Sequence, residues 1–177
     1  MMKKTFALSV IALGTALSTT VAQATTTTGT LNVTATITSS CSVNTTATGS
    51  SIGNSTLNFG TVSNFQSATD ANTGTTAGGA GAINVLCNNG TSWTLAFDGG
   101  SNASSGQRRM AGGTSEYIPY NLYADSAYST AIAVNGTVKG TGTGSVQAVP
   151  VYGRIPAGTI LPSASTYLDT VTMTITY

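Results

Sequence analysis

The stretch TTTTGTLNVTATITSSC, residues 25–41, alternates apolar and polar side chains and carries no charge. In an extended chain, one face of this segment presents its apolar side chains, Leu31, Val33, Ala35 and Ile37. Proteins normally protect such an edge from pairing with other chains by charge or proline, and neither occurs here. The alternation predicts either an ordinary first strand or a strand that pairs with another chain.

The residues before this segment have the layout of a secretory signal peptide. Lys3 and Lys4 are followed by an apolar run over residues 6–17 and by the small-residue pattern AQA at residues 22–24. The apolar run is shorter than the roughly 20 residues that a membrane-spanning helix needs. We therefore expect residues 1–24 to be a signal peptide and the protein to be exported.

The composition of the remaining chain favours one all-β domain. Residues 25–177 have a net charge of −1, and Arg108 and Arg109 are their only adjacent basic pair, which we expect in a solvated loop. Nucleic-acid binding needs clustered Lys and Arg, so it is not expected. Clusters of β-branched and aromatic residues alternate with Gly, Asn and Ser runs, as in a sandwich or barrel. Because exported chains meet oxidising conditions, we expect one disulfide, Cys41–Cys87.

The positions of these clusters predict the strands. They are expected over residues 39–44, 56–62, 81–87, 92–98, 118–124, 132–134, 146–155 and 168–177. The glycine-rich stretches 67–81 and 98–116 are expected to be loops. The turn signal at residues 88–90 predicts a hairpin between two of the strands, with Trp93 in the core.

The last predicted strand mirrors the first segment. Its apolar face carries Val171, Met173, Ile175 and Tyr177, and threonines alternate with them. We expect no later residue to cover the free side of this strand. The domain is therefore expected either to pair its own terminal strands or to leave a strand position vacant for a neighbouring chain, and periodicity supports both.

The sequence lacks the residue sets that most catalytic and metal sites need. It has no histidine, and its two cysteines are expected to be bonded, which excludes Ser/His/Asp, Cys/His and His-ligated metal sites. Asp98, Glu116 and Asp125 lie in unrelated contexts, and residues 70–74 lack the glycine and final glutamate of a calcium loop. We expect no enzyme activity, cofactor or metal.

Several blocks together resemble the spore coat protein U domain family, and within it the major subunits of archaic, Csu-type chaperone-usher pili. They are SSCSV at 39–43, LNFGTVS at 57–63, YNLYAD at 120–125, VPVYGRIPAG at 149–158 and YLDTVTMTITY at 167–177. The chain departs from the family at residues 163–165, where Ser-Ala-Ser replaces the usual Pro-x-Gly turn.

The resemblance implies an incomplete immunoglobulin-like β-sandwich that lacks its last strand and is completed by donor-strand exchange. Residues 25–38 are then the N-terminal donor-strand extension, and residues 39–177 are the incomplete pilin domain. The implied donor side chains are Leu31, Val33, Ala35 and Ile37. The implied lining of the acceptor groove is Val171, Met173, Ile175 and Tyr177.

The function that the resemblance implies is that of a structural subunit of an adhesive extracellular pilus, supporting surface attachment and biofilm formation. The implied partners are a periplasmic chaperone, an outer-membrane usher and identical or related pilin subunits. Two alternatives remain: a secreted coat protein with a self-completed sandwich, and a lectin-like adhesin that stacks sugar on Trp93, Tyr117 or Tyr120. A tip adhesin usually carries a second domain, for which residues 25–177 leave no room.

Overall fold

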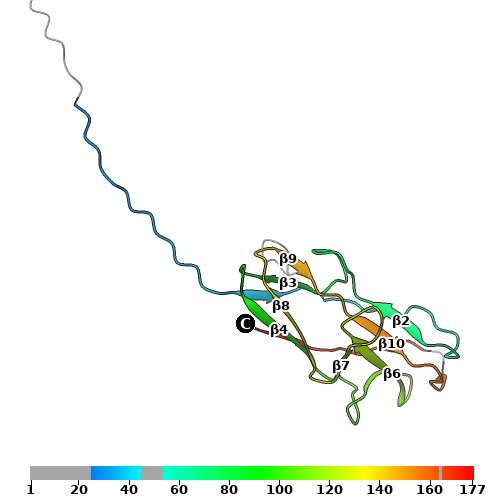
Figure 1. Ribbon diagram of the computed structural model, residues 1–177. Coiled ribbons are helices and arrows are strands. Elements are labelled where there is room, and N and C mark those ends of the chain that lie inside the picture. The colour runs from blue at the N-terminus through cyan, green and yellow to red at the C-terminus, as the bar shows by residue number, and fades with distance from the viewer. Residues whose placement is uncertain (1–24, 45–53, 164) are drawn as a thin grey trace, which may run out of the picture. The chain divides into compact units, whose positions relative to one another are not determined.

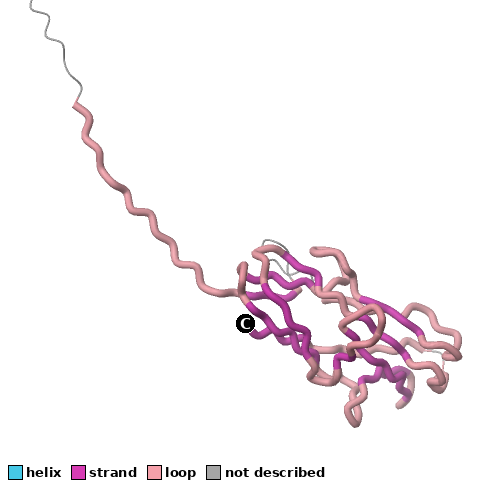
Figure 2. Tube along the Cα trace, viewed as in Figure 1, coloured by secondary structure: helices cyan, strands magenta, loops and turns pink. Residues whose placement is uncertain are grey.

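The computed structural model describes residues 25–44, 54–163 and 165–177. Within these ranges every regular element is a β-strand (Figures 1 and 2), and no helix is long and apolar enough to cross a membrane. The predicted signal peptide lies outside the described residues. The chain divides into two units, Met1–Thr36 and Ile37–Tyr177, and the strands belong to the second.

The strands of the described chain form three antiparallel sheets. In chain order they are β1 (Cys41–Val43), β2 (Thr69–Asn72), β3 (Asn84–Cys87), β4 (Ser92–Phe97), β5 (Arg108–Gly112), β6 (Glu116–Tyr123), β7 (Ala131–Ile132), β8 (Thr137–Thr141), β9 (Val146–Ala148), β10 (Tyr152–Ile155) and β11 (Met173–Thr176). The sheet orders are β1-β3-β9, β2-β10-β6-β5 with β7 on β6, and β11-β4-β8.

All three sheets contribute to one hydrophobic core. Val85 on β3, Leu95 on β4 and Ile155 on β10 are essentially inaccessible to solvent. Trp93 is only 5% exposed, which confirms its predicted place in the core and leaves no ring face open to a sugar. This architecture is all-β and consistent with the expected immunoglobulin-like sandwich.

The predicted disulfide is confirmed. Cys41 and Cys87 are bonded, and they are directly opposite residues of the short β1–β3 ladder. Because β1 has only three residues, the covalent bond reinforces a short ladder.

Two stretches predicted as loops contain strands instead. Residues 69–72 form β2, which pairs with β10, and residues 108–112 form β5, which pairs with β6. Arg108 is therefore not in a solvated loop. It is 3% exposed, and its guanidinium donates hydrogen bonds to four backbone carbonyls, those of Phe97, Asp98, Ile132 and Ala133. Strand β8 was also not predicted.

The predicted hairpin is wrong, although its turn is present. Gly90 adopts a positive φ of 80°, and the N–H of Thr91 donates to the carbonyl of Asn88. However, β3 and β4 belong to different sheets. Each strand buries an apolar face in the shared core, so the turn carries the chain from one sheet to another.

The long strand predicted over residues 146–155 is divided. Pro150 has no N–H to donate to a ladder, and it separates β9 from β10. Strand β9 pairs with β3, whereas β10 pairs with β2 and β6. The break therefore also marks a change of sheet.

Two other predicted strands are extended but largely unpaired. Residues 56–62 form no strand, and within residues 168–177 the ladder covers only Met173–Thr176, apart from an isolated bridge between Leu168 and Ala111. Residues 168–172 do make hydrogen bonds on one side, but their partners are Ala111 of β5 and residues 98 and 101 of a loop, which do not form one continuous ladder.

Removing the disulfide is expected to destabilise the domain. The loop that it closes separates the cysteines by 46 residues, for which loop-closure entropy gives about 4 kcal/mol. Replacing both cysteines, Cys41→Ala with Cys87→Ala, should lower the free energy of unfolding by up to this amount, measured by urea denaturation. Untreated and chemically reduced native chain serve as controls. An unchanged free energy of unfolding would show that the bond is dispensable.

Candidate functional site

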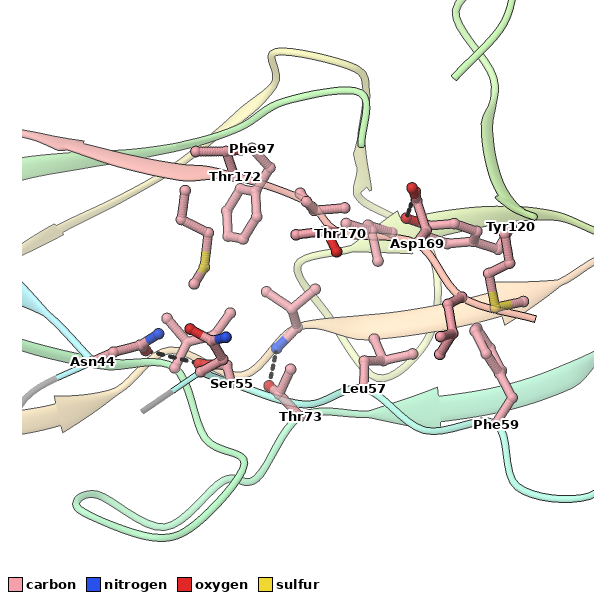
Figure 3. A pocket seen from close by; sticks show the side chains of 18 of the residues that line it. Asn44, Ser55, Leu57, Phe59, Thr73, Phe97, Tyr120, Asp169, Thr170 and Thr172 are labelled. Atoms are coloured by element: carbon pink, nitrogen blue, oxygen red, sulfur yellow. Dashed lines mark hydrogen bonds between the residues drawn. The ribbon is translucent and has the colours of Figure 1, made fainter. Parts of the chain in front are cut away.

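A cleft opens onto the core between two extended segments, which we call the first rim (residues 54–59) and the second rim (residues 165–173). Figure 3 shows Leu57 and Phe59 on one side and Asp169 on the other. The cleft consists of two adjoining cavities of about 600 and 940 Å³, and Leu57, Phe59 and Tyr167 line both.

The floor of the cleft is hydrophobic core. The buried hydrophobic residues that line the first cavity are Ile83, Phe97, Tyr120, Leu122 and Val151, and those that line the second are Phe65, Ile118 and Ile155; the buried polar residue Thr73 also lines the first. An apolar segment placed on this floor would bury its side chains at about 25 cal/mol for each Å² removed from water. The cleft is therefore suited to an apolar occupant.

Both rims alternate as strands do. On the first rim Leu57 and Phe59 are half-buried, and their neighbours are exposed. On the second rim the half-buried series is Tyr167, Asp169, Val171 and Met173, and the residues between them are exposed. A period of two means that each rim presents one side-chain face to the core, as the edge strands of a sheet would.

The backbone of the second rim is hydrogen-bonded on one side. Leu168 exchanges both backbone hydrogen bonds with Ala111, and the carbonyls of Thr170 and Thr172 accept from Ser101 and Asp98. Backbone groups of alternate residues in an extended chain point to opposite sides. Those of Asp169 and Val171 therefore point the other way, toward the cleft.

Nothing within the described residues pairs with these inward backbone groups. The N–H and C=O groups of Asp169 and Val171, and those of Leu57 and Phe59 on the first rim, make no hydrogen bond to another described residue. Backbone polar groups beside an apolar surface are costly to leave unpaired. A strand placed between the rims would satisfy both of them at once.

Polar side chains anchor the second rim to the domain. The carboxylate of Asp169 accepts hydrogen bonds from the Tyr120 hydroxyl at 2.7 Å and from Asn102 Nδ2 at 3.1 Å. Burial, together with this carboxylate, raises the pKa of Tyr120, which therefore stays protonated as a donor.

A second anchor lies three residues further along the rim, at Thr172. The side chain of Asp98 accepts hydrogen bonds from the N–H groups of Gly100 and Thr172, each at 2.8 Å. Burial opposes ionisation of this carboxyl, but the hydrogen bonds outweigh it and lower the pKa of Asp98. The rim is thus held even though its inner side is unpaired.

Glu116 makes a third attachment, at the start of the second rim. Its carboxylate accepts hydrogen bonds from the Tyr167 hydroxyl and from the N–H and Oγ of Ser163, at 2.8 to 3.0 Å. The Tyr167 ring lies against the bare backbone of Gly112, where an added Cβ would sit 2.6 Å from Cδ1. These contacts fix the Tyr167 side chain that both cavities share.

The structure places the four predicted groove residues differently from one another. Val171 and Met173 line the first cavity. Ile175 packs against the core beside β4, and Tyr177 is 58% exposed; neither is among the residues that line the two cavities. The groove thus begins near Met173 and extends toward residue 161, away from the end of the last strand.

The predicted donor residues are exposed. Leu31, Val33 and Ile37 are each more than 80% accessible to solvent, Ala35 is also exposed, and residues 25–40 contain no strand. Whether these side chains fill the cleft of another molecule is left as a prediction.

The sequence did not predict the first rim of the cleft or two residues of the second rim. Leu57 and Phe59 were assigned to a strand, but their role as a rim was not predicted, and neither Tyr167 nor Asp169 was singled out. The alternation in LNFGTV and in YLDTV carries the signal for facing the core, but it does not show which strand lacks a neighbour. Among the described residues, no three His, Cys, Asp or Glu side chains group together as metal ligands.

The Glu116 attachment predicts a dependence on pH. Hydrogen bonds from Tyr167 and Ser163 lower the pKa of Glu116 from 4.5, so the attachment is intact at neutral pH and is lost as the pH falls through the lowered value. NMR signals of the Tyr167 ring and the Ser163 amide should shift together in that acidic range. Glu116→Ala should abolish the transition.

Asp125→Asn provides the control for this titration. Hydrogen bonds from Ser129 and Thr130 lower the pKa of Asp125 to about 2, but these residues form a separate loop. The variant should leave the Tyr167 titration unchanged. Two results would contradict the role of Glu116: NMR signals of Tyr167 that do not shift with pH in the native chain, or signals that still shift in Glu116→Ala.

Comparison with known proteins shows the family and a similar fold. The model of the Spore Coat Protein U domain matches residues 27–174, whereas no curated protein matches the chain. A similar fold occurs in a crystal structure of the CsuC–CsuE chaperone–tip adhesion subunit pre-assembly complex from archaic chaperone-usher Csu pili of Acinetobacter baumannii, with a TM-score of 0.53 and 18% identity. The match covers 80% of this chain and 40% of that one. The chain belongs to the Spore Coat Protein U domain family.

Proposed function

We propose that this protein is a structural subunit of a chaperone-usher pilus whose cleft is filled by a strand from another chain. The single observation that carries the proposal is the pair of extended rims whose inward backbone groups lack partners above a hydrophobic floor. An added strand supplies main-chain hydrogen bonds to the rims and places alternate side chains on the floor.

Residues 25–38 are the proposed donor segment. Their apolar side chains are exposed, and the segment has the period that the cleft needs. At about 3.3 Å per residue, the extended segment from Leu31 to Ile37 spans about 20 Å, and the second rim spans about 26 Å. Burying its three large side chains contributes about 1.5 to 3 kcal/mol each.

The proposed assembly needs two successive occupants. A periplasmic chaperone lends a strand first, and the donor segment of the next identical or related subunit replaces it at an outer-membrane usher. The likeness to a chaperone–subunit complex supports this scheme. Export through the periplasm to a cell-surface fibre, attachment to surfaces and biofilm formation follow from the same proposal, and the role is structural rather than catalytic.

The alternatives have less support. A self-completed sandwich would need a strand of this chain between the rims, and the described residues of the unit Ile37–Tyr177 place none there. A lectin-like site on Trp93 or Tyr120 is contradicted, because both rings are buried. Tyr117 is 41% exposed, but the Arg109 guanidinium lies 4.1 Å from its ring centre.

Two complementary variants test the proposal. A chain that lacks residues 25–38 keeps an intact cleft, and Met173→Asp places a charge in the cleft but keeps an intact donor segment. Each should remain monomeric alone. Mixed together, they should form a dimer and nothing longer, because only one donor and one cleft are functional. Size-exclusion chromatography with light scattering measures the result.

Thr174→Asp is the matched control. Thr174 is adjacent to Met173, but it is exposed and faces away from the core. This variant should form multimers as the native chain does. Fibres formed by Met173→Asp alone, or by the chain without residues 25–38, would contradict the assignment of cleft and donor.

A further inference from the structure

One residue on the inward face of the second rim is charged. From the Met173 end, the face reads Met173, Val171, Asp169 and Tyr167, so an acid interrupts an apolar series. Both carboxylate oxygens of Asp169 are engaged, by Tyr120 and by Asn102. The backbone of Gly100 lies so close to this carboxylate that a Cβ there would collide with it. The position is therefore crowded as well as polar.

The proposed donor segment carries a matching irregularity. Its inward series reads Leu31, Val33, Ala35 and Ile37, in which Ala35 is the only small side chain. The acid is third on the rim when counted from Met173, and the alanine is third on the donor when counted from Leu31.

We propose that Asp169 sets the direction and register of the incoming strand by admitting only a small side chain opposite it, which is Ala35. This inference rests on the proposed function. The donor then runs antiparallel to the second rim. Leu31 lies opposite Met173, Val33 opposite Val171, and Ile37 opposite Tyr167.

The hydrogen bonding of the rim fits this register. The inward backbone groups of the rim belong to Asp169 and Val171, which are odd-numbered residues. In an antiparallel ladder, directly opposite residues share a side-chain face, and they exchange hydrogen bonds at every second pair, where the backbone groups of both residues point toward each other. Pairing Ala35 with Asp169 and Val33 with Val171 therefore satisfies both requirements, and a shift by one residue would turn the apolar face away from the floor.

Other directions or registers of the donor segment place a large side chain opposite Asp169, or place polar side chains on the apolar floor. A parallel donor with the same span sets Val33 opposite Asp169. An antiparallel donor shifted by six residues sets Gly29 there, but it leaves threonines opposite Val171 and Met173, on the apolar floor of the first cavity. The Ala35 register is the one that combines a small residue at Asp169 with large apolar residues on both sides.

Two substitutions in the exposed donor segment test the register. Ala35→Leu and Gly29→Leu both replace a small residue by leucine on the same face of a segment that carries no strand, so neither disturbs the fold of the domain. Multimers of Ala35→Leu should dissociate in guanidinium about tenfold faster than native multimers or more, because overpacking a filled site is destabilising. Those of Gly29→Leu should differ from native by about twofold or less.

The role of Asp169 is tested by a second substitution in the acceptor. In Asp169→Ala multimers, Ala35→Leu should lose most of its effect, since the carboxylate that excludes the larger side chain is gone. Retention of the full tenfold effect in Asp169→Ala would overturn the role of the acid. Circular dichroism checks that Asp169→Ala is folded.

The remaining outcomes are also decisive. A tolerated Ala35→Leu together with a sensitive Gly29→Leu would overturn the proposal in favour of the shifted register. Equal effects of the two substitutions, or none from either, would show that no single position selects a small residue. Failure of the native chain to multimerise would instead contradict the proposed function, which separates the two failures.

Discussion

The rest of the structure depends on an unmet requirement of the polypeptide backbone. Peptide groups beside an apolar surface need hydrogen-bond partners, and the two rims turn theirs toward a cleft in which the described chain places no strand. The floor between them is the same core that stabilises the domain. Completing the ladder and covering the core are therefore one event, and both gains come from a single added strand. This coupling is how the proposed assembly would be held together without a large preformed interface.

An incomplete sandwich must keep its open edge in order, and buried polar groups do this. Arg108 donates hydrogen bonds to four backbone carbonyls, one of which belongs to Phe97 in the floor of the cleft. Asp98 and Asp169 hold the second rim through hydrogen bonds on the side that faces away from the cleft. Glu116 fixes Tyr167 at the other end. Because these contacts are made by side chains, they leave the inward backbone groups of the rim available. The rim is preorganised for a partner strand rather than collapsed onto the core.

The sequence predicted the all-β class and the core position of Trp93, because composition and period-two alternation are local signals. It predicted the disulfide because two cysteines in an exported chain have only one possible pairing. It did not predict strands β2 and β5. The partner of β2 is β10, about 80 residues further along the chain, and β5 pairs with the adjacent β6 but lies in a stretch whose glycines and two arginines favoured a solvated loop. The hairpin failed because the turn at residues 88–90 specifies a reversal but not which sheet receives the chain. Val171 and Met173 were placed in the groove by the family resemblance, because their period supported a paired strand equally well. Leu57 and Phe59 became its opposite rim only through tertiary packing.

Amide hydrogen exchange of the rims in separated monomers and multimers tests the central claim most directly. The account predicts that the N–H groups of Leu57, Phe59, Asp169 and Val171 exchange rapidly in monomers and become protected in multimers, as an inserted strand accepts their hydrogen bonds. The N–H of Gly90, which already donates to the carbonyl of Gly142, should be the same in both. Rim amides that exchange equally fast in monomers and multimers would contradict the claim that a strand from another chain fills the cleft.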